Sequence, residues 1–274
     1  MVFKKFIKPD EGVVGIVVTV LVIGLIIIVT GTIQSIYVPQ WLEQKEAEHM
    51  FTVSYQFAQL KQSLDLLSVV EQRNAVNTYI TLGSPEIPIF GIGRTYDGLN
   101  IFNDGCGIAI SNNSSSYSFS LGTIKYSSEN SYFVDQSYIY EAGALILSQS
   151  GECILNGGPF FSISNFSDIL FNIINISSLE GKKVAGGYGT YSLHTEYLDS
   201  ANYTLDDIRF INITTNYKNA WREFLNSTDL NYSLLTYQIK DTSYGISVEF
   251  SGVLGSLKMK VSDISVQIAP GWIE

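Results

Sequence analysis

Apolar residues run without a break near the beginning of the chain. Of the 21 residues 13–33, 15 are Val, Ile or Leu and the other six are Gly or Thr. No charge occurs between Gly12 and Leu42. About 20 apolar residues in a helix cross the hydrocarbon core of a bilayer. Most of the residues in this run are β-branched, which favours strand in water. In lipid, however, an isolated segment must satisfy its own backbone hydrogen bonds, so it forms a helix. The pattern predicts a transmembrane helix over residues 13–36, after a leader of residues 1–12.

An amphipathic pattern follows Pro39 and Trp41 and predicts a juxtamembrane helix over residues 37–73. Apolar residues recur there at alternating spacings of three and four, which places them on one helix face. This stripe consists of Met50, Val53, Phe57, Leu60, Leu64 and Leu67. It either covers the β domain of the same chain or contacts neighbouring copies. Proline removes a backbone donor, so we expect a kink or interruption near Pro39. His49 is expected on the charged, solvated face.

From residue 74 onward, short β-rich runs alternate with clusters of Gly, Asn, Asp and Ser. Strands at this spacing are typical of a sandwich or barrel. Asp97-Gly98 and Asp104-Gly105 are predicted to be hairpin turns. The glycine-rich residues 181–189 are either a seam between two β-rich parts, 74–180 and 181–274, or a long loop.

One short helix interrupts the β pattern at "NYKNAWREFLN", residues 216–226. Thr215 or Asn216 is the expected N-cap, and Trp221, Phe224 and Leu225 share the inner face. The predicted fold class is therefore α+β: a long N-terminal transmembrane and juxtamembrane helix, then a β-rich, sandwich-like ectodomain with one short helix.

The flanks of the apolar run predict its orientation in a membrane. Lys4, Lys5 and Lys8 precede it, and the next basic residue is Lys45. The positive-inside rule places the N-terminus in the cytoplasm and the remainder outside. Eight Asn-x-Ser/Thr acceptors, all beyond the span, fit a glycosylated exterior domain: Asn112, Asn113, Asn165, Asn175, Asn202, Asn212, Asn226 and Asn231. The run exceeds the 7–15 apolar residues of a signal peptide, so a retained single-pass anchor is expected.

Charge and cysteine content exclude some partners. The net charge of −10 leaves no electrostatic footprint for nucleic acid. Cys106 and Cys153, the two cysteines, form either one disulfide or two thiols in a β core. They lie in no Cys/His cluster, so no zinc site is expected.

Residues with catalytic or metal-binding chemistry are sparse. Neither His49 nor His194 accompanies a nucleophile motif, and the neighbours Asp206 and Asp207 would point to opposite faces of a strand. The stretch "YDGLNIFNDGCG", residues 96–107, brings together several oxygen ligands for Ca²⁺, although Asp/Asn-Gly turns have the same composition. These ligands are Asp97, Asn100, Asn103 and Asp104. The sequence predicts neither an enzyme nor a cofactor.

Three stretches give the chain a resemblance to archaeal pilin-like, single-anchor surface proteins. "DEGVVGIVVTVLVIGLIIIV" resembles their N-terminal helix, "EAEHMFTVSYQFAQLKQSLD" its amphipathic extension, and "INITTNYKNAWREFLN" their strand leading into a short helix with a central Trp. The resemblance implies a helix that packs in a membrane or filament core and a β head facing outward. It also implies a candidate processing site between Gly12 and Val13. Here Asp10 and Glu11 stand where such sites usually carry a basic residue.

Two functions are compatible with these features. The first is a pilin-like structural protein of the cell surface, held in membrane lipid through residues 13–36. In this form it stands as an anchored monomer or small oligomer, or as a filament subunit that meets its neighbours through the N-terminal helix. The alternative is a membrane-tethered binding or adhesion module whose tyrosine-rich head recognises a glycan, an ion or a surface partner.

Overall fold

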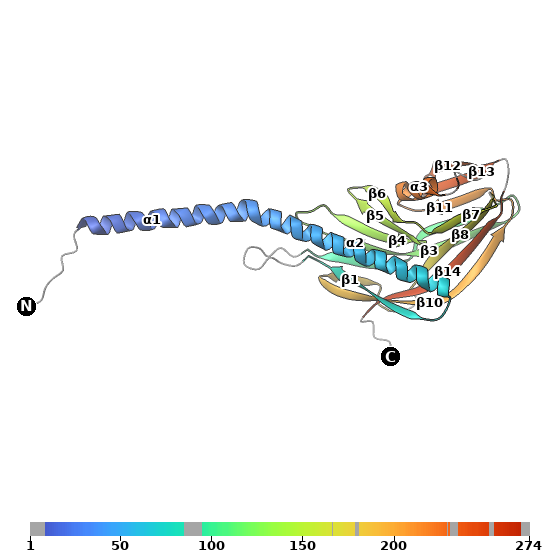
Figure 1. Ribbon diagram of the computed structural model, residues 1–274, viewed down its shortest axis with the longest axis horizontal. Helices are drawn as coiled ribbons and strands as arrows, with labels where there is room; N and C mark the ends of the chain where they lie inside the picture. Colours follow the sequence, from blue (N-terminus) through green and yellow to red (C-terminus); the bar gives the residue numbers. More distant parts are fainter. Residues whose placement is uncertain are drawn as a thin grey trace, which may run out of the picture.

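The protein consists of one long helix that projects from a β-rich domain (Figure 1). The computed structural model describes residues 9–84, 95–165, 167–178, 181–228, 230, 235–251 and 255–269, and the side chains from residue 13 onward within these ranges. This arrangement confirms the predicted α+β class, with a long N-terminal helix, a β-rich domain and one short helix.

The long helix is continuous but not uniform. It comprises α1 (Pro9–Thr32), the π-helical turn η1 (Ile33–Tyr37) and α2 (Val38–Val70). The π turn lies directly before Pro39, which cannot donate a hydrogen bond and whose ring would clash with the carbonyl four residues earlier. The helix axis changes direction at this point (Figure 1). The interruption predicted near Pro39 is thus a π turn.

The described residues form fourteen strands. Those before residue 160 are β1 (Ala75–Leu82), β2 (Asp97–Ser111), β3 (Ser116–Ser127), β4 (Gln136–Glu141), β5 (Ala144–Gln149) and β6 (Glu152–Gly157). Those after it are β7 (Phe160–Ser164), β8 (Asp168–Ser177), β9 (Val184–Gly187), β10 (Gly189–Leu205), β11 (Phe210–Thr214), β12 (Thr236–Thr242), β13 (Gly245–Ser251) and β14 (Leu257–Ala269). The remaining helix is α3 (Lys218–Ser227).

The strands build two sheets. One has the order β1-β10-β14-β8-β7, and the other has the order β12-β13-β11-β2-β3-β4-β5-β6 with β9 beside β2. Neighbouring strands are antiparallel except β14 and β8, which run parallel with Ile264 opposite Ile176. Strands from both sides of residues 181–189 occur in both sheets, and this segment itself contributes β9. The predicted parts 74–180 and 181–274 are therefore interleaved and are not structural halves.

Both predicted Asp-Gly hairpin turns are wrong, because Asp97-Gly98 and Asp104-Gly105 lie inside strand β2. The second pair lies where the register between β2 and β3 shifts, as at a β-bulge. The β4–β5 hairpin instead turns at Ala142 and Gly143, both with positive φ, as two-residue type I′ turns require.

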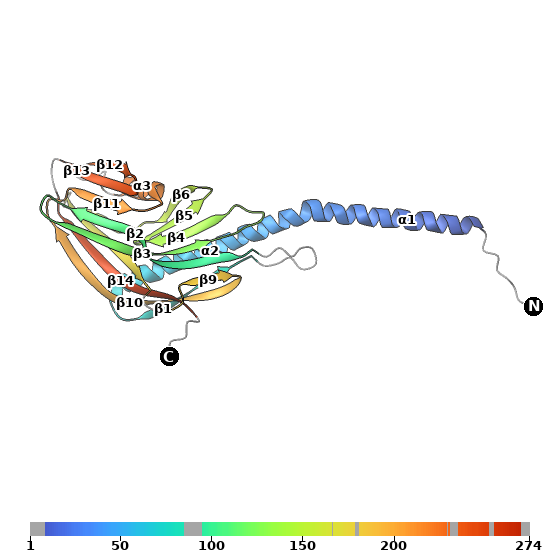
Figure 2. The ribbon, with the colours of Figure 1, turned by 180° about the vertical axis from the view of Figure 1, so that it is seen from behind.

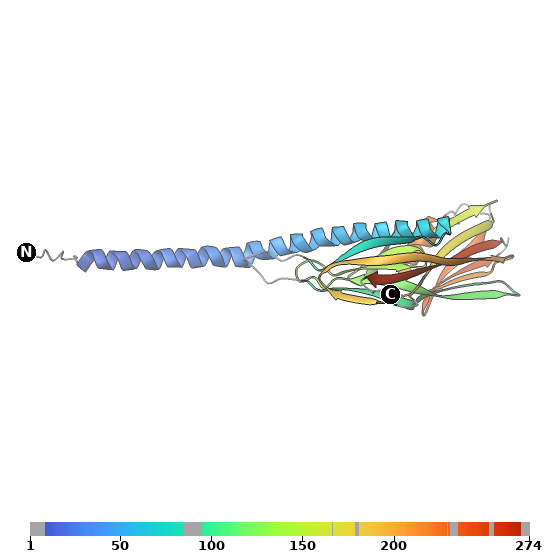
Figure 3. The same cartoon turned by 90° about the horizontal axis from the view of Figure 1, so that it is seen from below.

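Two helices cover two hydrophobic cores on opposite faces of the shared strands. On β4, Tyr138 and Tyr140 pack in the cluster that contains α2, which we call the proximal core. Ile139, between them, packs in the cluster that contains α3, which we call the distal core. Alternate residues of a strand point to opposite faces, so β4 is buried on both sides. Figure 3 shows α2 lying along one side of the β domain while α1 extends beyond it.

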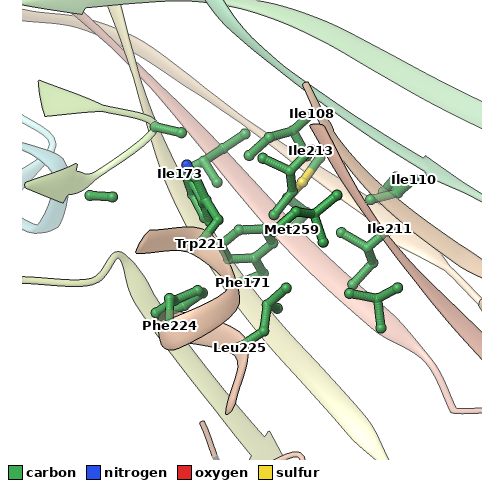
Figure 4. Packing of buried hydrophobic residues seen from close by; sticks show 14 of the residues in the cluster. Ile108, Ile110, Phe171, Ile173, Ile211, Ile213, Trp221, Phe224, Leu225 and Met259 are labelled. Atoms are coloured by element: carbon green, nitrogen blue, oxygen red, sulfur yellow. The ribbon is translucent and has the colours of Figure 1, made fainter. Parts of the chain in front are cut away.

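Helix α3 confirms the short helix expected from the sequence. Trp221, Phe224 and Leu225 are buried and point from α3 toward the strands of the distal core (Figure 4). The N-cap position is Tyr217 and carries no side-chain cap, so neither Thr215 nor Asn216 caps the helix. Thr215 instead donates its hydroxyl hydrogen to Glu141 Oε1 at 2.6 Å.

Candidate functional site: the anchor helix and its attachment

Helix α1 is long and apolar enough to cross a membrane as a single-pass anchor. No side chain between Val13 and Tyr37 is buried, although most of them are Val, Ile or Leu. A helix that is apolar all round and exposed in water would be unfavourable, whereas lipid removes that cost. The candidate processing position, Gly12–Val13, lies within the first turns of α1. Lys4, Lys5 and Lys8 lie outside the described residues.

Aromatic side chains mark the end of the apolar segment. Tyr37 and Trp41 lie one helical turn apart with ring centroids separated by 6.2 Å, and both rings are partly exposed. Tyrosine and tryptophan are enriched at the headgroup level of membranes because their rings are amphipathic. The pair therefore stands where the helix would leave the bilayer.

The predicted stripe of α2 is buried in the β domain of its own chain. Its six members pack in the proximal core: Met50, Val53, Phe57, Leu60, Leu64 and Leu67. Each is at most 2% exposed, so none is available to a neighbouring copy. Of the two interpretations of this stripe, coverage of the chain's own β domain is the one observed. Burying each such side chain contributes about 1.5–3 kcal/mol, so α2 is an integral part of the fold.

His49 is buried, contrary to the expectation that it is solvated. Its Nε2 lies 2.9 Å from Asp97 Oδ2 and 3.1 Å from the hydroxyl of Tyr126. Tyr126 also donates its hydroxyl hydrogen to the same carboxylate oxygen, and the Gly83 N–H donates to it at 2.6 Å. These contacts join α2 to the first residue of β2 and to the end of β3.

The charge of Asp97 is stabilised by its partners. Burial disfavours the carboxylate, but hydrogen bonds from His49, Tyr126 and the Gly83 N–H outweigh burial and lower the pKa of Asp97. Burial and the adjacent Asp97 carboxylate raise the pKa of Tyr126 well above its usual value, so the phenol remains a donor. The network is a charged junction between helix and sheet, and its described part includes no serine or cysteine nucleophile.

Glu46 makes a second polar attachment between α2 and the β domain. Its carboxylate accepts backbone N–H groups from Ser131 at 3.0 Å, Tyr132 at 2.8 Å and Phe133 at 2.6 Å. Glu46 is only 2% exposed, and three donors compensate for removing its charge from water. The loop between β3 and β4 is thereby fixed to the helix one turn before His49.

The distal core contains another buried carboxyl group, Glu141 at the end of β4. Its Oε1 accepts hydrogen bonds from Thr215 Oγ1 and Trp221 Nε1, both at 2.6 Å. Its Oε2 is buried and has no hydrogen-bond partner among the described residues. Burial raises the pKa of Glu141 to about 7, although the bonds from Thr215 and Trp221 act in the opposite direction.

A groove of about 590 Å³ lies between the C-terminal half of α2 and strands β7 and β8. Phe160, Leu170 and Val69 contribute apolar surface to it. Lys61 lines it and is held at 2.8 Å from Asp65 and 3.0 Å from the carbonyl oxygen of Gly143. Asn172 also lines the groove, and its Oδ1 is buried without a hydrogen-bond partner in the described part of the chain. The groove therefore presents both apolar and polar groups on one concave surface.

The oxygen-rich stretch of residues 96–107 does not assemble into a calcium site. Asp97 is buried in the proximal core, whereas Asn103 and Asp104 are exposed on the same strand. Asn100, three residues from Asp97, points to the opposite face of β2. Among the described residues, no three His, Cys, Asp or Glu side chains are grouped closely enough to hold a metal ion.

The candidate glycosylation positions differ in accessibility. Asn113, Asn165, Asn202, Asn212 and Asn226 are exposed. Asn112 and Asn175 are half-buried, and Asn231 lies outside the described residues. The amide nitrogen of Asn175 donates to Asp263 Oδ1 at 2.7 Å, and its oxygen accepts the Gly122 N–H at 3.0 Å. Both polar atoms of this side chain are therefore already hydrogen-bonded within the protein.

The two cysteines are free thiols and form no disulfide. Cys106 is buried on β2 and Cys153 is half-buried on β6, and both contact the distal core. Three strands separate β2 from β6, which corresponds to about 19 Å along the sheet. A disulfide needs Cα atoms within about 7 Å. His194, the second histidine, lies on β10 with Nδ1 2.9 Å from Asn77 Oδ1.

The burial of Glu46 and His49 was missed, although the sequence contains a signal for it. His49 lies four residues before Val53 and Glu46 lies four residues before Met50, so both stand at helical spacing from the stripe, and both are buried. Similarly, Asp97 alternates with the buried Leu99 along β2.

Comparisons of the chain with protein-family models, with curated proteins and with solved structures find no match. Known proteins therefore assign neither a family nor a function to this chain.

Proposed function

We propose that the protein is a pilin-like structural protein of the cell surface, anchored in a membrane by α1 and displaying its β domain outside. One observation carries the proposal: a single continuous helix is exposed and apolar over α1 but buries one face in the β domain over α2. One part of the helix is thus suited to lipid and the other to holding the domain. This function needs no catalytic group or cofactor.

The orientation is proposed from the sequence. Three lysines precede the span, and the positive-inside rule assigns them to the cytoplasm. Five exposed glycosylation acceptors on the β domain support an exterior location for it. Because the stripe of α2 is occupied by its own domain, any helix-mediated contact between copies involves α1 or the outer face of α2. An anchored monomer or small oligomer is the form we propose.

Charges placed in the span test the anchor. A lysine at the centre of a transmembrane helix costs about 2.5–3.5 kcal/mol of insertion free energy. We expect Ile23→Lys/Ile27→Lys to lose retention in alkali-washed membranes. The matched control is Gln59→Lys/Gln62→Lys, because both glutamines are exposed on α2. Equal retention of both variants would contradict the anchor.

The mature N-terminus tests the form of the protein. N-terminal sequencing of the native chain should give Met1 or Val2 for a retained anchor. A start at Val13 would instead indicate processing after Gly12 and favour a filament subunit.

The groove beside α2 favours a second candidate function, a membrane-tethered binding module. The exposed ring of Phe160 suits the apolar face of a sugar, and Lys61 and Asp65 line the same groove with polar groups that suit its hydroxyls. If this is the function, Phe160→Ala in the full chain should abolish retention on a glycan array, while Phe51→Ala, an exposed position on α2, should not. No retention of the parent chain on any glycan would remove this candidate.

A further inference from the structure

A small patch of aromatic and basic residues surrounds strand β9. It consists of Tyr96, Lys182, Lys183, Val184 and Tyr188, and we call it the β9 patch. Tyr96, Val184 and Tyr188 are each more than half exposed, and the two tyrosine rings have centroids 6.4 Å apart. β9 pairs with the first residues of β2, so strand pairing holds the patch in place. Figure 2 shows β9 at the end of the β domain nearest α1.

The length of the uncharged helix places the tyrosine end of this patch, Tyr96 and Tyr188, close to a membrane surface, and Lys183 lies beside Ile101, about 13 Å further along β2. Residues 13–42 contain no charge, and 30 residues of helix span about 45 Å. This matches a bilayer with its headgroups, about 40–45 Å. His49 follows Leu42 by seven residues, or about 10 Å, and contacts Asp97, the neighbour of Tyr96. An average helix tilt of about 20° brings one side of the β domain closer still to the headgroups.

The chemistry of the patch suits lipid headgroups. Tyrosine rings favour the interface because one end is apolar and the other polar. Lysines next to a membrane are attracted to anionic lipids. The Lys182 ammonium lies 5.1 Å from the centre of the Tyr191 ring, which keeps it close to the aromatic surface. The loop fixed by Glu46 carries the exposed acidic residues Glu129 and Asp135, so the β9 patch is the side suited to negative charge.

We propose that the β9 patch rests on the headgroup surface of an anionic bilayer and fixes the orientation of the β domain on the membrane. The proposal rests on the anchoring function of α1. The occupant is the lipid surface itself, because α1 leads the chain out of that surface and α2, which continues the same helix, is packed on the β domain.

Lysine labelling of the full chain in lipid nanodiscs tests the proposal. A water-soluble acylating reagent is applied to discs of phosphatidylcholine alone and to discs that also contain phosphatidylglycerol. Labelling of Lys182 and Lys183, measured by mass spectrometry, is expected to be about fivefold slower in the anionic discs. Lys258 is an internal control, because it is exposed at the beginning of β14, at the opposite end of the domain.

Substitution of the tyrosines adds a second readout. Tyr96→Ser/Tyr188→Ser should remove most of the protection of Lys182 and Lys183, whereas Tyr244→Ser, an 80% exposed tyrosine in the β12–β13 turn, should leave it unchanged. Equal labelling of the parent chain in both discs would overturn the proposal while leaving the anchor intact. Failure of the chain to elute with the discs would instead count against the anchor itself.

Discussion

Asp97 and Glu141 are both buried carboxyl groups that connect a helix to the sheets, yet their pKa values are shifted in opposite directions. Asp97 receives hydrogen bonds from His49 on α2, Tyr126 and the Gly83 N–H, and its pKa is lowered. Glu141 receives two, including one from Trp221 on α3, and its pKa is raised to about 7. Burial raises the pKa of a carboxyl group, and hydrogen bonds to the ionised form lower it. With three donors on one oxygen, the hydrogen bonds outweigh burial at Asp97; with two, burial outweighs the hydrogen bonds at Glu141.

The two groups consequently give stability opposite dependences on pH. Asp97 contributes stability above its unfolded pKa, near 4, and this is lost as the pH falls through its lower folded pKa. Glu141 favours folding when protonated, so its contribution is lost as the pH rises from about 4.5 to about 7. Between these limits, near pH 4–5, both carboxyl groups are in their preferred states.

The largest expected effect comes from removing the charge of Asp97. Asp97→Asn leaves His49 and Tyr126 facing an amide that cannot accept as many hydrogen bonds. Hydrogen bonds to a charged group contribute about 1.5–3 kcal/mol each, so weakening two of them costs about 3–6 kcal/mol. We expect a loss of this size in urea unfolding of the full chain in detergent at pH 7. Asp104→Asn, exposed on the same strand, is the control, and equal midpoints for the two variants would contradict the role of the junction.

Replacing Glu141 with glutamine should change mainly how the free energy of unfolding depends on pH. A shift from 4.5 to about 7 corresponds to about 3 kcal/mol of unfolding free energy lost between pH 4.5 and 8. Glu141→Gln cannot ionise, so this loss should disappear and the variant should be more stable than the parent at pH 8. Unfolding curves at pH 5 and pH 8 measure the difference. An unchanged pH dependence in the variant would show that Glu141 does not titrate in this range.

Removing one donor from Asp97 should have a smaller effect. Tyr126→Phe deletes one hydrogen bond to the carboxylate, which costs about 1.5–3 kcal/mol, and raises the pKa of Asp97 toward its ordinary value. The midpoint of acid unfolding should therefore move to higher pH, as tyrosine fluorescence can follow. Tyr79→Phe, an exposed tyrosine on β1, should behave like the parent. A midpoint at lower pH than that of the parent would contradict the conclusion that the Tyr126 hydrogen bond stabilises the Asp97 carboxylate.

The smallest effect is expected for the distal core under reducing conditions. Cys106 and Cys153 are free thiols, so dithiothreitol should leave the melting temperature unchanged. The parent chain and Cys153→Ser should also respond identically to the reductant. A disulfide closing a loop of this length would contribute about 4 kcal/mol, so a marked fall in melting temperature on reduction would reveal one.

Features set by local pattern could be predicted from the sequence. The apolar run, the stripe of α2 and the inner face of α3 each depend on residues close together in the chain. The helical spacing of these apolar residues in the sequence places them on one helix face, and that face is the one buried in α2 and α3. Asp97-Gly98 shows where this fails, because the dipeptide that favours a turn is here part of a strand that neighbouring strands hold extended.

Features that depend on distant residues could not be predicted. The burial of His49 requires Asp97 and Tyr126, which lie 48 and 77 residues away in sequence. The pKa of Glu141 depends on a helix 80 residues further along. In both cases a polar residue is placed in a core, and only the fold reveals the partner that compensates for its burial.

The continuity of α2 with the anchor determines how the protein can be shed. α2 supplies a wall of the proximal core, so proteolysis anywhere between Val38 and Val70 would remove part of that core along with the membrane tether. A cut at the π turn or earlier would release the β domain with its packing complete. An intact soluble form of this protein therefore has to carry α2 away with it.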